Sequence, residues 1–249
     1  MDGTTAITQP AADERQLRID LAAAFRLVAK NDWHEAVANH LSLAISPDGK
    51  TFLMNPRWRH FSKLRASDMV VLDSTSPTTP PGIDKTAWII HGTMHAMAPH
   101  ARCILHVHPP YTTALACLAD PEIKPIEQTC ARFFRRHAID KHYGGMADNA
   151  AEGLRLVQAL GGHNVMLMGN HGVLTTGNTV AEAFDALYHV ERACRTMVLA
   201  YSTGQKLSRL SDEIAETTAR AWEDDGAFAA AHFAEMKLSL DDEDPSYKT

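Results

Sequence analysis

The amino-acid sequence predicts a single-domain α/β protein of three layers (α/β/α), in which helices cover both faces of a central, mostly antiparallel or mixed β-sheet. Two observations predict this class. Short strand-like runs follow one another through turns instead of alternating regularly with helices, and amphipathic helical segments lie between them. The 249 residues and 45% hydrophobic content suit one domain with a full core. We expect this domain at residues 15–235, between a flexible N-terminal tail (1–14) and a frayed, acidic C-terminal tail (236–249).

The opening part of the chain carries one helical and three strand-like patterns. Apolar residues recur at helical spacing in residues 15–30, which predicts an amphipathic helix that packs on the sheet. The runs LSLAIS and TFLMNP flank the turn signal Pro47-Asp48-Gly49, so together they predict a β-hairpin. Residues 69–73 predict a further strand.

The middle of the chain begins with a loop rich in Pro, Ser and Thr. Residues 86–97 then show helical periodicity, and Asp84 is placed to cap this helix. The run CILHVH, residues 103–108, alternates like a strand and ends at Pro109-Pro110, because proline has no amide proton to donate to a sheet. Residues 111–119 predict a short helix.

The last part of the predicted domain pairs a hairpin-like segment with two helices. Residues 150–162 predict a helix that ends at a Gly-Gly pair. The runs VMLMG and VLTTG bracket the turn Asn170-His171-Gly172. Thr179 and Glu182 have the spacing of a capping box, which predicts a long helix through Tyr201.

Composition excludes several classes of function. The formal charge of −6 and the pI near 6.1 leave no basic surface for nucleic acid or an anionic membrane. No apolar run approaches the ~20 residues of a membrane helix, and the polar N-terminal sequence lacks the apolar core of a signal peptide. We therefore expect a cytoplasmic protein with a small-molecule substrate and no nucleic-acid or membrane partner. The cysteines match neither redox nor zinc-finger spacing and are expected as buried, reduced thiols: Cys103, Cys117, Cys130 and Cys194.

The run CILHVH carries the main chemical signal. The period of two in a strand places His106 and His108 on one face, roughly 6–7 Å apart, so that both imidazoles can converge on one metal ion. The alternative is a pair of solvent-facing or core histidines. His189 lies beside an apolar stripe of the predicted long helix, from which its ring could face the sheet as a third ligand. Three histidines with an open coordination position are typical of a catalytic metal site.

Two longer segments carry a family resemblance. HGTMHAMAPHARCILHVHPPYTTALA and GNHGVLTTGNTVAEAFDALYHVERA resemble the two signature regions of the class II aldolase/adducin family, and the similarity extends over about residues 15–205. The resemblance implies one divalent metal ion per subunit, held by His106, His108 and His189. Zinc is the first expectation, and manganese, cobalt or iron are alternatives because imidazole suits most of these ions. The resemblance also implies a homotetramer with active sites at subunit interfaces, where a neighbour's residue from the 132–143 stretch completes each pocket.

One departure from the family concerns proton transfer. In the family's phosphosugar aldolases a glutamate lies 21 residues before the second histidine of the HxH motif, and this sequence has Ala87 there. The methyl group of alanine cannot accept or donate a proton, so a neighbour must replace the glutamate or the reaction needs no base at that point. The catalytic candidates are Asp84, Lys85, Tyr111 and His171. Their structural alternatives are a helix cap, a solvated charge, a core ring and a turn residue.

A second departure concerns the family's phosphate pocket. Its Gly-Asn, Thr-Gly and Ser-Ser pairs correspond here to Ala38-Asn39, Arg57-Trp58 and Lys85-Thr86, so the asparagine alone is kept intact. The substrate-binding candidates are Asn39, Arg57, Trp58, Thr86 and His91. Arg57 suits a carboxylate as well as a phosphate, and Trp58 could face a flat ring, although a surface charge beside a buried Trp explains this pair equally well.

Together these features predict a metal-dependent carbon–carbon lyase. The resemblance implies decarboxylation or aldol cleavage of a small hydroxylated carboxylate or carbonyl compound through a metal-stabilised enolate. Loss of the glutamate favours a decarboxylase-like branch, because decarboxylation needs a proton donor to finish but no base to start. Two alternatives stay open: an Fe(II)-dependent oxygenase on the same scaffold, and a non-catalytic, adducin-like interaction module.

Overall fold

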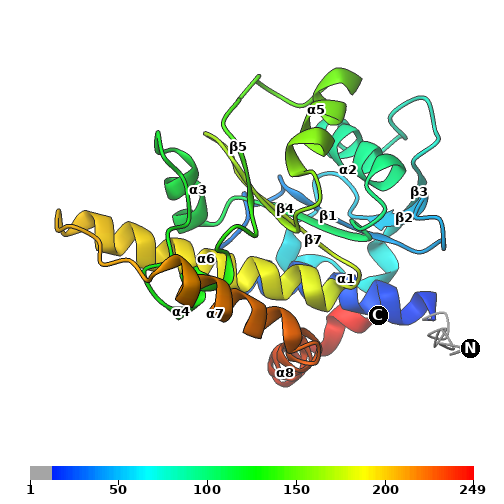
Figure 1. Ribbon diagram of the computed structural model, residues 1–249. Helices are drawn as coiled ribbons and strands as arrows, with labels where there is room; N and C mark the ends of the chain where they lie inside the picture. The colour runs from blue at the N-terminus through cyan, green and yellow to red at the C-terminus, as the bar shows by residue number, and fades with distance from the viewer. Residues whose placement is uncertain (1–12) are drawn as a thin grey trace, which may run out of the picture.

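The computed structural model describes residues 13–249 and confirms the three-layer α/β architecture (Figure 1). Within these residues the sheet has seven strands in the order β3-β2-β1-β4-β7-β6-β5. Each neighbouring pair is antiparallel except β5 with β6, which are parallel, so the sheet is mixed, as predicted. The strands are β1 (His40–Ala44), β2 (Thr51–Met54), β3 (Val70–Asp73), β4 (Cys103–Val107), β5 (Ala138–Asp140), β6 (Val165–Met168) and β7 (Gly172–Gly177).

Helices cover both faces of this sheet. In Figure 1, α2 and α5 lie on one side, and α1, α6 and α8 lie on the other. The helices are α1 (Glu14–Lys30), α2 (Lys85–Met97), α3 (Pro110–Ala116), α4 (Gln128–Arg132), α5 (Ala150–Leu160), α6 (Val180–Ser202), α7 (Asp212–Asp224) and α8 (Phe228–Glu243). No helix within residues 13–249 has the length and apolar character needed to cross a membrane.

Side chains of the central strand β4 alternate between two separate hydrophobic clusters. Cys103, Leu105 and Val107 belong to the main core, which they share with α1 and α6. Ile104 belongs to a second core, which it shares with α2 and α5. Because side chains alternate across a strand, His106 lies on the same face as Ile104. The alternation of side chains along β4 therefore decides which helices lie on the same side of the sheet as His106.

Several predicted elements and caps are confirmed. Asp84 caps α2 by accepting hydrogen bonds from the backbone amides of Thr86 and Ala87 at 2.9 and 3.2 Å. Thr179 caps α6 by accepting from the amide of Glu182 at 3.1 Å. The carboxylate of Glu182 accepts from the amide of Asn178, one residue before the position that a capping box uses.

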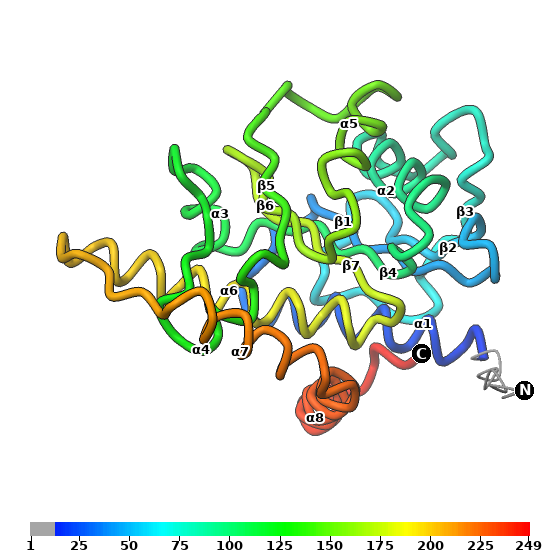
Figure 2. Tube along the Cα trace, in the orientation of Figure 1, coloured from blue at the N-terminus to red at the C-terminus, as the bar shows by residue number. Residues whose placement is uncertain are grey.

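The C-terminal segment corrects the prediction of a frayed acidic tail over residues 236–249. Residues up to Glu243 form the second half of α8, and a 3-10 helix follows at Pro245–Lys248. The side chain of Tyr247 is fully buried in the main core. Acidic residues of the segment pair with basic residues of α1: Asp244 with Arg26 at 3.1 Å and Glu243 with Lys30 at 2.5 Å. Figure 2 shows the red end of the trace beside α1.

Other differences are local. The predicted flexible segment 1–14 lies outside the described residues except for Asp13, which caps α1, and Glu14, which begins it. Helix α3 ends at Ala116 rather than at residue 119, and Cys117, expected to be buried, is exposed at its end. The sequence patterns did not reveal α4, β5, α7 or α8, because α4 and β5 are too short to show periodicity and α7 and α8 lie beyond the recognised motifs.

Candidate metal centre

Three histidines converge at one end of the central strands. His106 and His108 come from β4 and the residue after it, and His171 comes from the turn between β6 and β7. One ring nitrogen of each lies within 4.8 Å of the others. The centroid of the His171 ring is 4.7 Å from both the His106 and the His108 ring centroids. Antiparallel pairing of β4 with β7, with Val107 opposite Val173, brings the turn to the histidines.

Hydrogen bonds leave suitable nitrogen lone pairs at this cluster. The carbonyl of Val173 can only accept, so His106 Nδ1 donates to it at 3.0 Å, and Nε2 is left without a proton when the ring is neutral. His108 Nδ1 lies 3.5 Å from a carboxylate oxygen of Glu35. His108 Nε2 is buried without a hydrogen-bond partner, so this nitrogen is available to a bound ion.

The same three rings are held neutral by their surroundings. Burial and, to a smaller extent, the neighbouring His108 together lower the pKa of His171 to about 4. Burial also lowers the pKa of His106 well below its usual value, and it lowers that of His108 against the opposing effect of Glu35. Neutral imidazole is the form that binds a metal ion, so the cluster fits a divalent cation.

Gly172 allows the strands to approach closely at this point. A Cβ atom on Gly172 would lie 2.5 Å from His108 Cδ2 and 2.6 Å from the carbonyl oxygen of Val107. We expect Gly172→Ala to displace His108 and to weaken Zn²⁺ binding about 10- to 100-fold, the usual effect of disturbing a ligand's support. Titration against a chromophoric chelator measures this. Gly162→Ala, where an added Cβ meets nothing within 4 Å, is the matched control, and equal affinities for both variants would contradict the prediction.

The third ligand predicted from sequence, His189, lies elsewhere. His189 belongs to α6, and the neighbouring side chains of that helix pack in the main core with Leu105 and Val107. His106 and His108 lie on the opposite face of the sheet, toward α2 and α5. The structure therefore does not bring His189 to its predicted partners His106 and His108, and His171 takes its place in the cluster. The physical reason is that the sheet separates the helix from the strand histidines.

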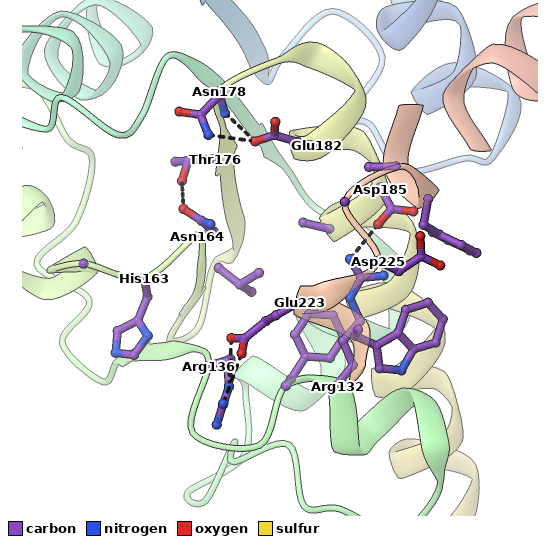
Figure 3. Close-up of a pocket in the computed structure, with 18 of the residues that line it drawn as sticks. Arg132, Arg136, His163, Asn164, Thr176, Asn178, Glu182, Asp185, Glu223 and Asp225 are labelled. Atoms are coloured by element: carbon purple, nitrogen blue, oxygen red, sulfur yellow. Dashed lines mark hydrogen bonds and ion pairs between the residues drawn. The ribbon is translucent and has the colours of Figure 1, made fainter. Parts of the chain in front are cut away.

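His189 instead joins a second cluster, with Asp185 and His232. The carboxylate of Asp185 accepts hydrogen bonds from His232 Nδ1 at 2.7 Å and from Arg132 Nη2 at 2.6 Å. His189 Nδ1 lies 3.2 Å from Oδ1 of the same carboxylate. Burial opposes ionisation of Asp185, but the two histidines and Arg132 outweigh it and lower its pKa. Figure 3 shows Arg132 reaching Asp185 beside a cavity of about 690 Å³. Because Arg132 already balances the carboxylate and repels cations, this cluster is an ion-pair network that joins α4, α6 and α8.

A smaller cavity, of about 220 Å³, lies against the first cluster. Its apolar wall includes Ile90 and Met146. The polar side chains that line it are Asn39, His40, Thr86, His106, His108, Tyr143 and His171. Among the described residues no carboxylate lines this cavity. The volume suits a ligand smaller than a drug-sized molecule, since pockets for such molecules measure about 300–1,000 Å³.

The predicted catalytic candidates separate in the structure. His171 is part of the cluster, whereas Tyr111 packs against the main core on the other side of the sheet. Asp84 is occupied as the cap of α2 and by a hydrogen bond of 2.7 Å from the hydroxyl of Thr86. Lys85 has an exposed side chain 3.6 Å from Asp148. Neither Asp84 nor Lys85 lines the cavity.

The substrate-binding candidates also divide. Asn39 and Thr86 line the cavity. Arg57 stacks over the ring of Trp58 at 4.1 Å, and Trp58 is 64% exposed, so this pair lies outside the cavity wall. His91 is fully buried behind His40 and does not reach the cavity.

Two cavity residues and one buried position near the cavity add to the sequence prediction. His40 lines the cavity but was not among the candidates, and Tyr143, the last residue of the 132–143 stretch expected to reach a neighbour's pocket, lines the cavity of its own chain. His40 pairs with His106 across β1 and β4, a signal that appears only when the strand register is known. Ala87, at the position of the family's glutamate, is 2% exposed and packs with Phe52 and Trp88 in a small apolar cluster. The position at which the resemblance led us to look for a glutamate is therefore apolar here.

The fold and this site define a class: an α/β protein whose central strands carry a small, histidine-lined cavity. Residues 19–198 match the family model described as the Class II Aldolase and Adducin N-terminal domain. The chain therefore belongs to the class II aldolase and adducin family, as the sequence resemblance predicted.

Proteins similar to this chain carry names that refer to different activities. The chain is 32% identical, over 83% of its own length and 80% of the relative's, to a Pseudomonas aeruginosa protein assigned to aldolase class 2. It is 26% identical to the decarboxylase NovR of Streptomyces niveus, over 75% of this chain and 69% of the relative. A crystal structure of an aldolase II superfamily protein from Pseudomonas syringae superposes with a TM-score of 0.87 at 30% identity and covers 98% of both chains.

Proposed function

We propose that this protein is a divalent-metal-dependent carbon–carbon lyase, a decarboxylase or an aldolase, that acts on a small hydroxylated carboxylate or carbonyl compound. The observation that carries the proposal is the convergence of His106, His108 and His171, with His108 Nε2 buried and unpartnered. Membership in a family that includes aldolases, and likeness to a protein named as a decarboxylase, support the reaction class.

These three histidines would hold one divalent ion, with Zn²⁺ as the first expectation. When bound, the ion would supply positive charge next to the substrate oxygens on which negative charge develops. Asn39 would help to orient the substrate: its side-chain oxygen accepts from the amide of Glu35 at 2.8 Å, so its amide group is free to donate into the cavity. Ile90 and Met146 would exclude water from the apolar side.

The lack of a carboxylate among the described residues that line the cavity favours decarboxylation over retro-aldol cleavage. Aldol cleavage requires a base that removes the proton of a substrate hydroxyl, and neither Ala87 nor any other described residue places a carboxylate in the cavity wall. Decarboxylation breaks the carbon–carbon bond without a base and needs one proton at the end. The phenol of Tyr143 lines the cavity and could deliver that proton.

A homotetramer belongs to this proposal. The cavity opens beside Tyr143, which is 49% exposed, and Met146, which is 71% exposed. Apolar and aromatic side chains that are this exposed at the mouth of a site suit burial by a neighbouring subunit. Active sites at subunit interfaces would account for this exposure.

Elemental analysis combined with a substrate screen tests the proposal. The purified protein is analysed for metal, and hydroxy-acids are screened for release of carbon dioxide or an aldehyde, with and without a chelator. We expect one equivalent of metal per subunit and turnover that the chelator abolishes. Oxygen consumption with Fe²⁺ would instead indicate an oxygenase. Absence of metal after loading with each divalent ion would leave the adducin-like interaction module.

A further inference from the structure

A network of four polar side chains is buried between the sheet and α2, directly behind the cavity. His40 and Ser42 share one face of β1, and His91 and His95 share one face of α2. His40 Nδ1 lies 2.8 Å from His91 Nε2, His91 Nδ1 lies 2.5 Å from Ser42 Oγ, and Ser42 Oγ lies 2.8 Å from His95 Nε2. None of the four residues is more than 6% exposed. We call these residues the histidine–serine network.

A buried polar network costs stability, because apolar side chains of similar shape would pack there without unpaired groups. Its presence beside a cavity therefore favours a functional role. The rest of the wall around it is apolar: Ile90, Met94 and Ile104 lie in the adjoining core. The network begins at the cavity, which His40 lines, and ends at His95, inside the protein. The chain of hydrogen-bonded side chains therefore connects the interior of the protein with the cavity.

The protons of this network can be arranged in two ways. Burial lowers the pKa of His95 to about 3, so its ring is neutral and carries one proton. Ser42 has one proton and lies between two ring nitrogens, so it donates to one ring and accepts from the other. If it donates to His91, then His91 donates to His40, and the proton of His40 lies on Nε2. If it donates to His95, every bond reverses, and the proton of His40 lies on Nδ1.

The end of the network selects between these arrangements. His95 Nδ1 is buried and has no hydrogen-bond partner. In the first arrangement it is an unpaired acceptor, whereas in the second it is an N–H group without any acceptor. Among backbone groups, buried N–H groups without an acceptor are rarer than buried carbonyls without a donor, and we take the same preference for these ring nitrogens. The first arrangement is therefore favoured, and Nε2 is the nitrogen that His40 leaves for the cavity.

We propose that the histidine–serine network fixes His40 in the tautomer with its proton on Nε2, so that His40 is a neutral hydrogen-bond donor to a substrate oxygen. Ser42, His91 and His95 are positioning residues that act through His40. A neutral donor suits a site where negative charge develops on oxygen, because it stabilises that charge and adds no cation beside the metal ligands. The ring of His40 lies 5.1 Å from that of His106, so such a donor would face the same ligand.

The tautomer itself can be measured without a substrate. In Zn²⁺-loaded protein with ¹⁵N-labelled histidine, NMR spectra that correlate ring nitrogens with ring carbon-bound protons show which nitrogen carries the proton. We expect Nε2–H for His40 and for His91. His137, whose Nδ1 donates to the Phe133 carbonyl at 2.9 Å, serves as the internal Nδ1–H reference. A proton on Nδ1 of His40, which would free Nε2 as a further metal ligand, would overturn the proposal.

The functional half of the inference rests on the proposed lyase activity and is tested by Ser42→Ala. This variant removes the hydroxyl but leaves His40 and the metal ligands in place. We expect mixed tautomers at His40 and about 10-fold lower kcat, with metal content and KM little changed. Thr175→Val is the matched control, because it removes a buried hydroxyl that donates to the Ala183 carbonyl at 3.0 Å, away from the network.

Failure of the lyase proposal and failure of this inference are distinguishable. A protein that shows Nε2–H at His40 but turns over no hydroxy-acid refutes the lyase and keeps the donor tautomer. An active enzyme whose Ser42→Ala variant retains full kcat and an unchanged His40 tautomer refutes the role of the network. If Ser42→Ala does not fold, the spectrum of the wild-type protein still decides the tautomer.

Discussion

His171→Ala should abolish stoichiometric metal binding, whereas His189→Ala should leave it unchanged. His171 supplies one of three converging nitrogens, while His189 lies across the sheet and bonds to Asp185. Removing one of three protein ligands leaves too few donors to hold a divalent ion at micromolar concentration. Elemental analysis of each variant after dialysis against a weak chelator gives the metal content. Lyase turnover should follow the metal content.

The control for this comparison is His108→Ala, which removes a ligand that both assignments share and should lose metal in either case. Circular dichroism of each variant shows whether it has folded. Full metal content in His171→Ala would refute the site described here. Loss of metal in a folded His189→Ala variant would restore the ligand set that the sequence predicted.

Tyr247→Ala should lower the free energy of unfolding by about 3–5 kcal/mol, the usual cost of truncating a large buried aromatic side chain to alanine. Tyr247 is fully buried in the main core, and its hydroxyl donates to Asp241 at 2.8 Å. Tyr247→Phe removes only that hydrogen bond and should cost about 1 kcal/mol. Urea denaturation of the three proteins measures both effects. Equal stability of Tyr247→Ala and the wild-type protein would show that this segment is the frayed tail that its acidic sequence suggested.

The fold and half of the site could be predicted because their signals are local. Alternation in residues 103–108 places His106 and His108 on one face, and the family signature identifies the segment with the Asn170-His171-Gly172 turn. Helix caps such as Asp84 and Thr179 depend on a few neighbouring residues and were predicted correctly. These features need no knowledge of how distant segments pack.

The remaining features depend on long-range packing. The periodicity of α6 shows that His189 borders an apolar stripe, but not which face of the sheet the helix covers. His40 becomes a cavity residue only through its register with His106. The acidic C-terminal residues resemble a solvated tail because their partners, Arg26 and Lys30, are more than two hundred positions earlier. A sequence pattern on one segment does not reveal the segment that it meets.

The burial of Tyr247 has a consequence for biosynthesis. Tyr247 shares the main core with Phe25 and Leu21 of α1, and its segment pairs with that helix. A ribosome that adds about 5–20 residues per second needs roughly 10–40 s to extend the chain from α1 to Tyr247. During that interval one wall of the main core is missing, and the apolar side of α1 is incompletely covered. The nascent chain thus completes its core only after nearly the whole domain has been translated.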